Sequence, residues 1–307
     1  MTLIYTDPLF ARHQMPPRHP EQSARMAAVL DALAASRFDG LERRTATPAS
    51  YEAIARVHPS SYLDRITSCI PETGMIALDP DTHMGPESWD AARLASGAAI
   101  AAVDAVVGLE APNAFVVARP PGHHAERTTA MGFCLINHVA VAARHAQAVH
   151  GLGRIAIVDF DVHHGNGTQD IFYDDPSVFY GSTHQSPLYP GTGAAGERGA
   201  GNILNVPVDA GTDGAAYRPR FRDTIVAALE DFRPELIILS AGFDAHADDP
   251  LGGMGLVEDD YVWITHQMMD VAAQTAHGRL VSVLEGGYDL SALGRSAAAH
   301  VGALAGV

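Results

Sequence analysis

Short apolar runs alternate with longer, Ala-rich segments along most of the 307-residue chain. The short runs are rich in β-branched residues and end at turn-forming residues, which is typical of β-strands. The longer segments have the length and the apolar repeat of helices. Their alternation predicts β–α units arranged on a mainly parallel sheet. Because the strand segments are apolar at almost every position, we expect both faces of this sheet to be buried.

The segments that fit the strand pattern are Leu3–Tyr5, Ala114–Ala118, Arg154–Phe160, Val178–Gly181, Leu236–Ala241 and Arg279–Leu284. The segments that fit the helix pattern are Pro20–Ser36, Pro86–Gly108, Asn137–His150, Ala215–Asp231 and Glu258–His277. No linker-like stretch, internal repeat or low-complexity tract divides the chain, so we expect one domain over residues 1–307.

Composition excludes several classes of function. The chain has 20 Lys and Arg against 36 Asp and Glu, a formal net charge of −16, which argues against nucleic-acid binding because that needs a basic face. We see neither a secretory signal nor a membrane-spanning segment. The two cysteines, Cys69 and Cys134, are too few for a disulfide framework. We therefore expect a cytoplasmic protein that does not bind membranes.

Polar, Gly-rich or His-rich segments directly follow most of the predicted strands. They are Arg119–His124, Asp161–Gly167, Ser182–His184, Gly242–His246 and Glu285–Tyr288. In open parallel sheets the ligand lies outside the carboxyl ends of the strands. We therefore expect these five segments to meet at one site.

The segment from Asp159 to His163 carries the strongest chemical signal. On an extended backbone alternate side chains point the same way, so Asp159, Asp161 and His163 would share one face. Two neighbouring carboxylates repel each other unless a cation or a proton lies between them. The alternative to a cation site is that the two aspartates cap helices and the histidine is exposed to solvent. Helix capping accounts for one Asp and not for both.

Asp244 follows another predicted strand and on its own would be interpreted as a helix cap. Together with Asp161 and His163, it makes a set of two carboxylates and one imidazole. Such a set leaves a coordination position open, as catalytic divalent-metal sites do. Zn²⁺ suits these ligands best, with Fe²⁺, Co²⁺ and Mn²⁺ as alternatives for an oxygen-rich site.

His123 and His124 follow a Pro-Pro-Gly turn at another predicted strand end. A chance pair is the alternative in a chain with 16 His, but a general base must lie beside the water it activates, and this position satisfies that requirement. Asp159 is the candidate carboxylate partner for one of them. Tyr288 follows two glycines, which favours a turn that presents its hydroxyl to a developing oxyanion; ordinary packing is the alternative.

The segment Gly191–Gly196 matches the dinucleotide fingerprint GxGxxG. No strong strand pattern precedes it and no helix pattern follows, so we interpret it as a flexible loop. The chain has no P-loop and no GxSxG motif. Cys134 carries no signal of a reactive thiolate and is expected to be a small buried hydrophobe.

A series of motifs runs in order along nearly the whole chain. They are His19–Glu21 (HPE), Arg119–Ala125 (RPPGHHA), Gly132–His138 (GFCLINH), Asp159–Gly167 (DFDVHHGNG), Tyr189–Gly193 (YPGTG), Ala241–Leu251 (AGFDAHADDPL) and Glu285–Tyr288 (EGGY). In these motifs the chain resembles the zinc-dependent histone deacetylase family, in its class II-like bacterial form, the histone deacetylase-like amidohydrolases. The resemblance implies the α/β arginase/deacetylase fold, a single domain whose central, mainly parallel sheet of about eight strands is flanked by helices.

The resemblance also implies two cation sites. Asp161, His163 and Asp244 match the family's zinc ligands, which is the set reached above from the residues alone. Asp159, Asp161, His163 and Ser182 match the positions that hold a structural monovalent cation, usually K⁺.

The family's catalytic positions are matched as well. His123 and His124 correspond to the tandem general acid/base pair, with Asp159 behind His123 and Asn166 behind His124. An amide stabilises an imidazolium less than a carboxylate does, so Asn166 should leave His124 less basic. Tyr288 matches the tyrosine that stabilises the transition state.

The channel for the acyl-lysine side chain corresponds to Gly132, Phe133, Tyr189 and Leu251. The second aromatic wall, Tyr189, is commonly Phe in the family. A rim carboxylate that binds the substrate backbone would be either Asp79 or Asp81.

The activity implied is removal of acetyl or other acyl groups from Nε-acetyl-lysine by zinc-activated water, on a protein or peptide. Acetylpolyamine hydrolysis is the alternative, since an acidic protein suits a small cationic acylated amine. Leu251 stands where the polyamine-selective branch has Glu, which favours acyl-lysine. A non-catalytic acyl-lysine-binding module would have lost a ligand, the His pair or Tyr288, and an arginase-like ureohydrolase needs a second metal. The oligomeric state stays open, a homo-oligomer included.

Overall fold

The computed structural model describes residues 2–307, and an eight-stranded sheet forms its centre, in the order β2-β1-β5-β10-β9-β6-β7-β8. All neighbouring strands in this sheet run parallel. The strands are β1 Thr2–Tyr5, β2 Glu42–Arg44, β5 Asn113–Val116, β6 Ile155–Asp159, β7 Val178–Gln185, β8 Ile203–Val208, β9 Leu236–Ala241 and β10 Leu280–Leu284. A separate antiparallel pair is formed by β3 Ile76–Ala77 and β4 His83–Met84.

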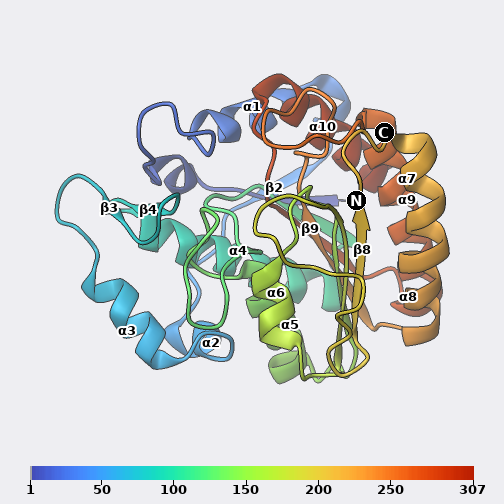
Figure 1. Ribbon diagram of the computed structural model, residues 1–307, viewed down its shortest axis with the longest axis horizontal. Coiled ribbons are helices and arrows are strands. Elements are labelled where there is room, and N and C mark those ends of the chain that lie inside the picture. Colours follow the sequence, from blue (N-terminus) through green and yellow to red (C-terminus); the bar gives the residue numbers. More distant parts are fainter. Residues whose placement is uncertain (1) are drawn as a thin grey trace.

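Helices flank the sheet (Figure 1). They are α1 Ala24–Ala32, α2 Tyr51–Ala55, α3 Ser60–Ser68, α4 Ser88–Val107, α5 His138–His150, α6 Asn166–Phe172, α7 Gly214–Phe221, α8 Ala227–Phe232, α9 Glu258–Thr275 and α10 Leu290–Ala305. Short turns of 3₁₀ helix, η1 Pro8–Arg12 and η2 Ser36–Phe38, and a π-helical turn, η3 Arg222–Val226, complete the chain. The α/β class expected from the sequence is confirmed.

The predicted strands are all present, with ends that differ by a few residues. The two edge strands, β2 and β8, were missed. The segment of β2 reads Glu-Arg-Arg, and the run of β8 is interrupted by Asn205 and contains Pro207, so neither shows the continuous apolar run that marks a central strand. The helix predicted over 215–231 is present as one continuous helical segment from Gly214 to Phe232, in which the π-helical turn η3 joins α7 to α8.

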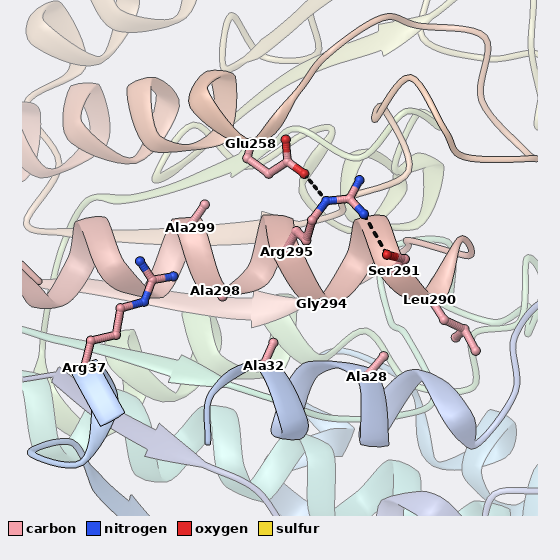
Figure 2. Close-up of a pocket in the computed structure, with 10 residues that line it drawn as sticks. All are labelled: Ala28, Ala32, Arg37, Glu258, Leu290, Ser291, Gly294, Arg295, Ala298 and Ala299. Carbon is pink, nitrogen blue, oxygen red and sulfur yellow. Dashed lines mark hydrogen bonds and ion pairs between the residues drawn. The ribbon is translucent and has the colours of Figure 1, made fainter. Parts of the chain in front are cut away.

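Helix α10 was also missed, and it packs closely against α1. Ala28 and Ala32 of α1 lie opposite Gly294 and Ala298 of α10 (Figure 2). A Cβ atom on Gly294 would lie 2.8 Å from the carbonyl oxygen of Ala28, so this crossing requires glycine. Small residues here let the two backbones approach and cover the sheet with a tight helical layer.

The carboxyl ends of the five central strands lie side by side. In the sheet, Asp159 at the end of β6 is level with Ser182 of β7 and with Ser240 of β9, and Leu284 of β10 is level with Ala241 of β9. Strand β5 neighbours β10. The five segments expected to meet therefore leave the sheet from adjacent strands.

Candidate functional site

A cavity of about 230 Å³ opens at these strand ends, and we call it the central cavity. Its walls come from the segments that follow β3, β5, β6, β7, β9 and β10. The lining residues are Asp81, His124, Gly132, Phe133, His163, Leu188, Tyr189, Leu251 and Tyr288. The sequence-based candidates for the channel, Gly132, Phe133, Tyr189 and Leu251, all contact it.

Asp161, His163 and Asp244 converge beside the central cavity, and all three are buried. His163 Nδ1 lies 3.0 Å from Asp161 Oδ1 and 3.1 Å from Asp244 Oδ2. The second oxygen of each carboxylate accepts a backbone N–H, from Gly286 for Asp161 and from Val162 for Asp244, each at 2.8 Å. Each carboxylate is thus fixed through one oxygen and turns the other toward His163.

The expectation of an extended backbone through His163 is wrong, because strand β6 ends at Asp159. Beyond it, tight turns hold the chain: Asp161 N–H donates to Asp159 Oδ1 at 3.1 Å, and His163 N–H donates to Asp161 Oδ1 at 2.9 Å. Aspartate side chains commonly bind their own backbone two residues on in this way. These turns place Asp161 and His163 together.

The trio of Asp161, His163 and Asp244 is stabilised by a positive charge between its two carboxylates. Burial and the neighbouring Asp161 carboxylate raise the pKa of Asp244 to about 7. Burial opposes a charge on His163, but hydrogen bonds to Asp161 and Asp244 raise its pKa to about 10. A divalent cation would replace that proton and satisfy both carboxylates.

Glycines leave room around the carboxylates of the trio. A Cβ atom on Gly286 would lie 2.1 Å from Asp244 Oδ2, and one on Gly242 would lie 2.2 Å from Asp161 Oδ2. The donor set, its orientation by backbone N–H groups and this cradle all fit a divalent cation.

His123 and His124 lie beside the trio, with ring centroids 4.1 Å apart. His123 Nδ1 is 2.9 Å from Asp159 Oδ2, and His124 Nδ1 is 2.8 Å from Asn166 Oδ1. Burial opposes charge on His123, but Asp159 and Asp161 raise its pKa well above the usual value. Burial and the charge of His123 hold the pKa of His124 well below the usual value.

The amide of Asn166 is oriented by a second contact. Its Nδ2 donates to Glu126 Oε1 at 2.8 Å, so Oδ1 is the atom that faces His124. The Nδ1 atom of His124 therefore carries the proton, and Nε2 keeps its lone pair. His124 is a neutral acceptor that lines the central cavity.

Tyr288 lines the central cavity from the turn after β10. Gly287 adopts a φ of 121°, which favours glycine, and its carbonyl accepts a hydrogen bond from Arg25 Nε at 2.6 Å. Asp249 Oδ2 accepts from the backbone N–H of Tyr288 at 2.6 Å. Burial raises the pKa of the Tyr288 hydroxyl well above its usual value, so it remains a donor.

Two residues of the cavity wall, Gly132 and Phe133, have positive φ angles, and the backbone at Gly132 lies close to the ring of His124. Gly132 has a φ of 57°, and a Cβ atom there would lie 2.4 Å from His124 Cδ2. Phe133 also has a positive φ, 69°, and its ring packs edge-on against His19, with centroids 4.7 Å apart. Such strain is held by surrounding contacts and is common at functional sites.

The structure distinguishes the two candidates for the rim carboxylate, Asp79 and Asp81. The Oδ1 atom of Asp79 accepts from the backbone N–H groups of Asp81 and Thr82, so this side chain stabilises its own turn. Asp81 faces the central cavity, and burial and Asp79 raise its pKa to about 6. Of the two, Asp81 is therefore placed to meet a ligand.

Comparison with known proteins decides the family. Residues 19–304 match the histone deacetylase domain. The chain belongs to the histone deacetylase family. It is 45% identical over 274 residues to a histone deacetylase-like amidohydrolase of Pseudomonas aeruginosa, covering 88% of this chain and 71% of that protein. It is 38% identical over 288 residues to a probable deacetylase of Archaeoglobus fulgidus, covering 92% and 79%.

The crystal structure of the HDA15 HD domain superposes on this chain with a TM-score of 0.93 and 35% sequence identity, covering 99% of this chain and 88% of that chain. The family and these relatives identify an enzyme of the deacetylase and amidohydrolase class, in which a metal-dependent site is the rule. The resemblance expected from the sequence motifs is confirmed.

Several residues of the candidate site were not found from the sequence. They are Arg25, Glu126, Leu188, Asp249 and the cavity-facing position of Asp81. Arg25 lies far away in the chain, on α1, and Glu126 lies just beyond a motif; Asp249 lies within the motif Ala241–Leu251, but the motif does not show that it binds the Tyr288 N–H. Only their contacts in the folded protein reveal them. Among residues 2–307, no helix combines the length and the apolar character that crossing a membrane requires.

Proposed function

We propose that this deacetylase hydrolyses Nε-acetyl-lysine, on a protein or peptide, to lysine and acetate, with Zn²⁺ as its catalytic cation. The observation that carries this proposal is that His163 of the trio, His124 and Tyr288 all line one narrow cavity. A metal site, a neutral base and a hydroxyl donor thus face the same small volume. This is the set of groups that hydrolysis of an unactivated amide requires.

A Zn²⁺ ion held by Asp161, His163 and Asp244 would polarise the acetyl carbonyl and lower the pKa of a bound water. His124 takes the proton of the attacking water on Nε2, while its Nδ1–H stays with Asn166. A C–O bond forms at the acetyl carbon, and the Tyr288 hydroxyl donates to the oxygen that gains negative charge.

The C–N bond then breaks, and the proton on His124 passes to the leaving amine, which gives the lysine side chain and acetate. His123 carries its charge against Asp159 throughout, at 2.9 Å, and stabilises the negative charge that develops beside it. Asp159 also accepts from the Tyr180 hydroxyl at 3.1 Å, which orients the carboxylate.

The cavity walls favour a lysine stem. Phe133 and Tyr189 offer aromatic faces to the methylene groups, and Leu251 closes the wall with an apolar side chain. An apolar gate gives no partner to the additional ammonium of a polyamine. Asp81 supplies a carboxylate that would accept hydrogen bonds from substrate backbone amides.

The net charge of −16 and the acidic Asp81 at the cavity support acetylpolyamine hydrolysis as the second candidate. The metal site, the histidines and Tyr288 would act in the same way on that substrate. The two candidates differ only in what the cavity wall recognises.

A structural K⁺ ion forms the last part of the proposal. Asp159, Asp161, His163 and Ser182 are buried, and Asp159 and Ser182 are paired in the sheet at the ends of β6 and β7. Backbone and side-chain oxygens of these residues would hold the ion. The Ser182 hydroxyl also contacts His184 Nδ1 at 2.8 Å.

The test compares kcat/KM for an acetyl-lysine peptide and for N8-acetylspermidine, using zinc-loaded protein and Asp161→Ala as the inactive control. Released acetate, the product common to both substrates, is the readout. Faster peptide turnover is expected. Faster turnover of the polyamine would contradict the proposed substrate. If Asp161→Ala kept both activities, the proposed mechanism would be wrong.

Leu251→Glu is the matched specificity variant. A carboxylate on the cavity wall should shift the ratio of kcat/KM values toward the polyamine, because it would pair with the additional ammonium. An unchanged ratio would show that Leu251 does not select the substrate.

A further inference from the structure

A second group of metal-ligating side chains lies on the surface, at the end of the sheet opposite the central cavity. Asp104 is in the last turn of α4, and His145 and His150 are on α5. Both helices end here and lead back to the amino-terminal ends of β5 and β6, whereas the central cavity lies at the carboxyl ends. None of the groups described above belongs to this cluster.

Two imidazole nitrogens converge on one carboxylate oxygen. His145 Nε2 and His150 Nε2 each lie 2.6 Å from Asp104 Oδ1, and the two rings have centroids 5.5 Å apart. Positions five apart on a helix differ by roughly 140° in direction, so helix geometry alone does not bring these histidines together. They reach Asp104 from either side because α4 packs on α5.

The electrostatics of the cluster favour a cation. Asp104 lies in the last turn of α4, where the negative end of the helix dipole disfavours a carboxylate. The carboxyl end of α5, at His150, faces the same place. Arg56 lines the adjoining surface hollow together with Asp104 and His145, but it is paired with Glu52 at 3.1 Å.

The solvent exposure of the three side chains and the free nitrogen atoms of the histidines also suit a metal ion. The side chain of Asp104 is 48% exposed, and those of His145 and His150 are 12% and 23% exposed, so water can complete a coordination shell. Within residues 2–307 no hydrogen bond holds the Nδ1 atom of either histidine. The imidazole proton can therefore move to Nδ1 and free Nε2 as a ligand.

We propose that Asp104, His145 and His150 form a second, surface metal site that binds Zn²⁺ or another borderline divalent cation such as Ni²⁺ or Co²⁺. Two imidazoles and one carboxylate suit these ions. Ligand atoms around a tetrahedral Zn²⁺ are roughly 3.3 Å apart, so the half-exposed Asp104 side chain must withdraw slightly from both histidines. The bound ion would join the ends of α4 and α5.

The experiment measures bound zinc per chain by mass spectrometry, after dialysis of the tag-free protein against buffered micromolar Zn²⁺. We expect two ions in the wild type, and one in Asp104→Asn and in His145→Ala/His150→Ala, both with unchanged deacetylase activity. His266→Ala removes an exposed histidine of α9 and should keep two ions. One ion in the wild type, or two in both cluster variants, would overturn the proposal.

Thermal unfolding separates this site from the catalytic one. In the Asp161→Ala background, added Zn²⁺ should still raise Tm, and the rise should disappear when Asp104→Asn is added. A rise that persists in the double variant would contradict the second site. Failure of the proposed catalytic function would instead appear as a wild type that binds zinc at the cluster but hydrolyses neither substrate.

Discussion

Tyr288 shows how much backbone support one side chain needs. Arg25 binds the carbonyl of Gly287 and lies 5.0 Å from the centroid of the Tyr288 ring, while Asp249 binds the Tyr288 N–H. The hydroxyl is thus held at the cavity by the turn rather than by contacts of its own. Its expected contribution is made in the transition state, when negative charge develops on the acyl oxygen.

Tyr288→Phe should lower kcat about 10²–10³-fold and leave KM nearly unchanged, because the hydroxyl donates only to the developing oxyanion. Steady-state kinetics on an acetyl-lysine peptide measure this. Zinc content and Tm should match the wild type, which serves as the control for folding. Retention of full kcat would refute the role of the hydroxyl.

Asn166 faces His124 with a neutral amide, while burial and the charge of His123 hold the pKa of His124 well below its usual value. A carboxylate at this position would stabilise the imidazolium and raise the pKa of His124. The change must be made together with Glu126→Gln, since Glu126 Oε1 lies 2.8 Å from Asn166 Nδ2 and two carboxylates would otherwise meet.

Asn166→Asp/Glu126→Gln should move the acidic limb of the kcat/KM profile to higher pH, because His124 must be neutral to accept a proton. The pH profile of Glu126→Gln alone is the reference. If the acidic limbs of the two variants coincide, His124 is not the base.

At the scale of elements, Glu285 joins loops from three strands. This buried carboxylate at the end of β10 accepts from the backbone N–H groups of Gly122 and His123, at 2.7 and 3.1 Å, and from Ser240 Oγ of β9 at 3.2 Å. It therefore fixes the loop that carries the histidine pair relative to the turn that carries Tyr288. Glu285 is a positioning residue.

Glu285→Ala should lower kcat by about 10-fold or more, because two buried N–H groups lose their acceptor and the histidine loop loses its register. Glu285→Gln should recover most of that loss, since an amide oxygen still accepts from both N–H groups. Parallel measurements of kcat and KM distinguish the variants. Equal loss in Gln and Ala would point to the charge rather than to positioning.

At the scale of the whole molecule, buried neutral histidines make stability depend on pH. Burial lowers the pKa of His58 and His138 to about 4 and that of His300 to about 3. The unfolded chain has ordinary histidine pKa values of about 6.5. Between these values the unfolded state binds protons that the folded state does not, so stability is lost as the pH falls below about 6.5.

The free energy of unfolding should fall by about 1.4 kcal/mol per pH unit for each such histidine between about pH 6 and pH 4. His300 contacts Thr265 and Ser282 and links α9, α10 and β10, so His300→Gln removes one such group. Urea unfolding of both proteins across this range measures the slopes. Parallel slopes would show that His300 does not contribute.

The sequence alone determined the class of the fold and the residues of the candidate site. Continuous apolar runs identify central strands, because both faces of a parallel sheet are buried, and polar residues that follow those runs must lie at one edge. Asp161, His163, Asp244, the histidine pair and Tyr288 could be named for that reason. The edge strands β2 and β8 lack this pattern, which is why they were missed.

The tertiary structure alone decided which side chains orient that site and which cavity residues face a ligand. Arg25, Asp249, Glu126 and Glu285 act through backbone atoms or amides of residues distant in the chain, and such contacts leave no periodic signal. The choice of Asp81 over Asp79 depends on a two-residue turn. The cluster of Asp104, His145 and His150 forms because α4 and α5 end side by side. Its residues have neither the spacing of a known motif nor helical periodicity, so the sequence did not indicate it.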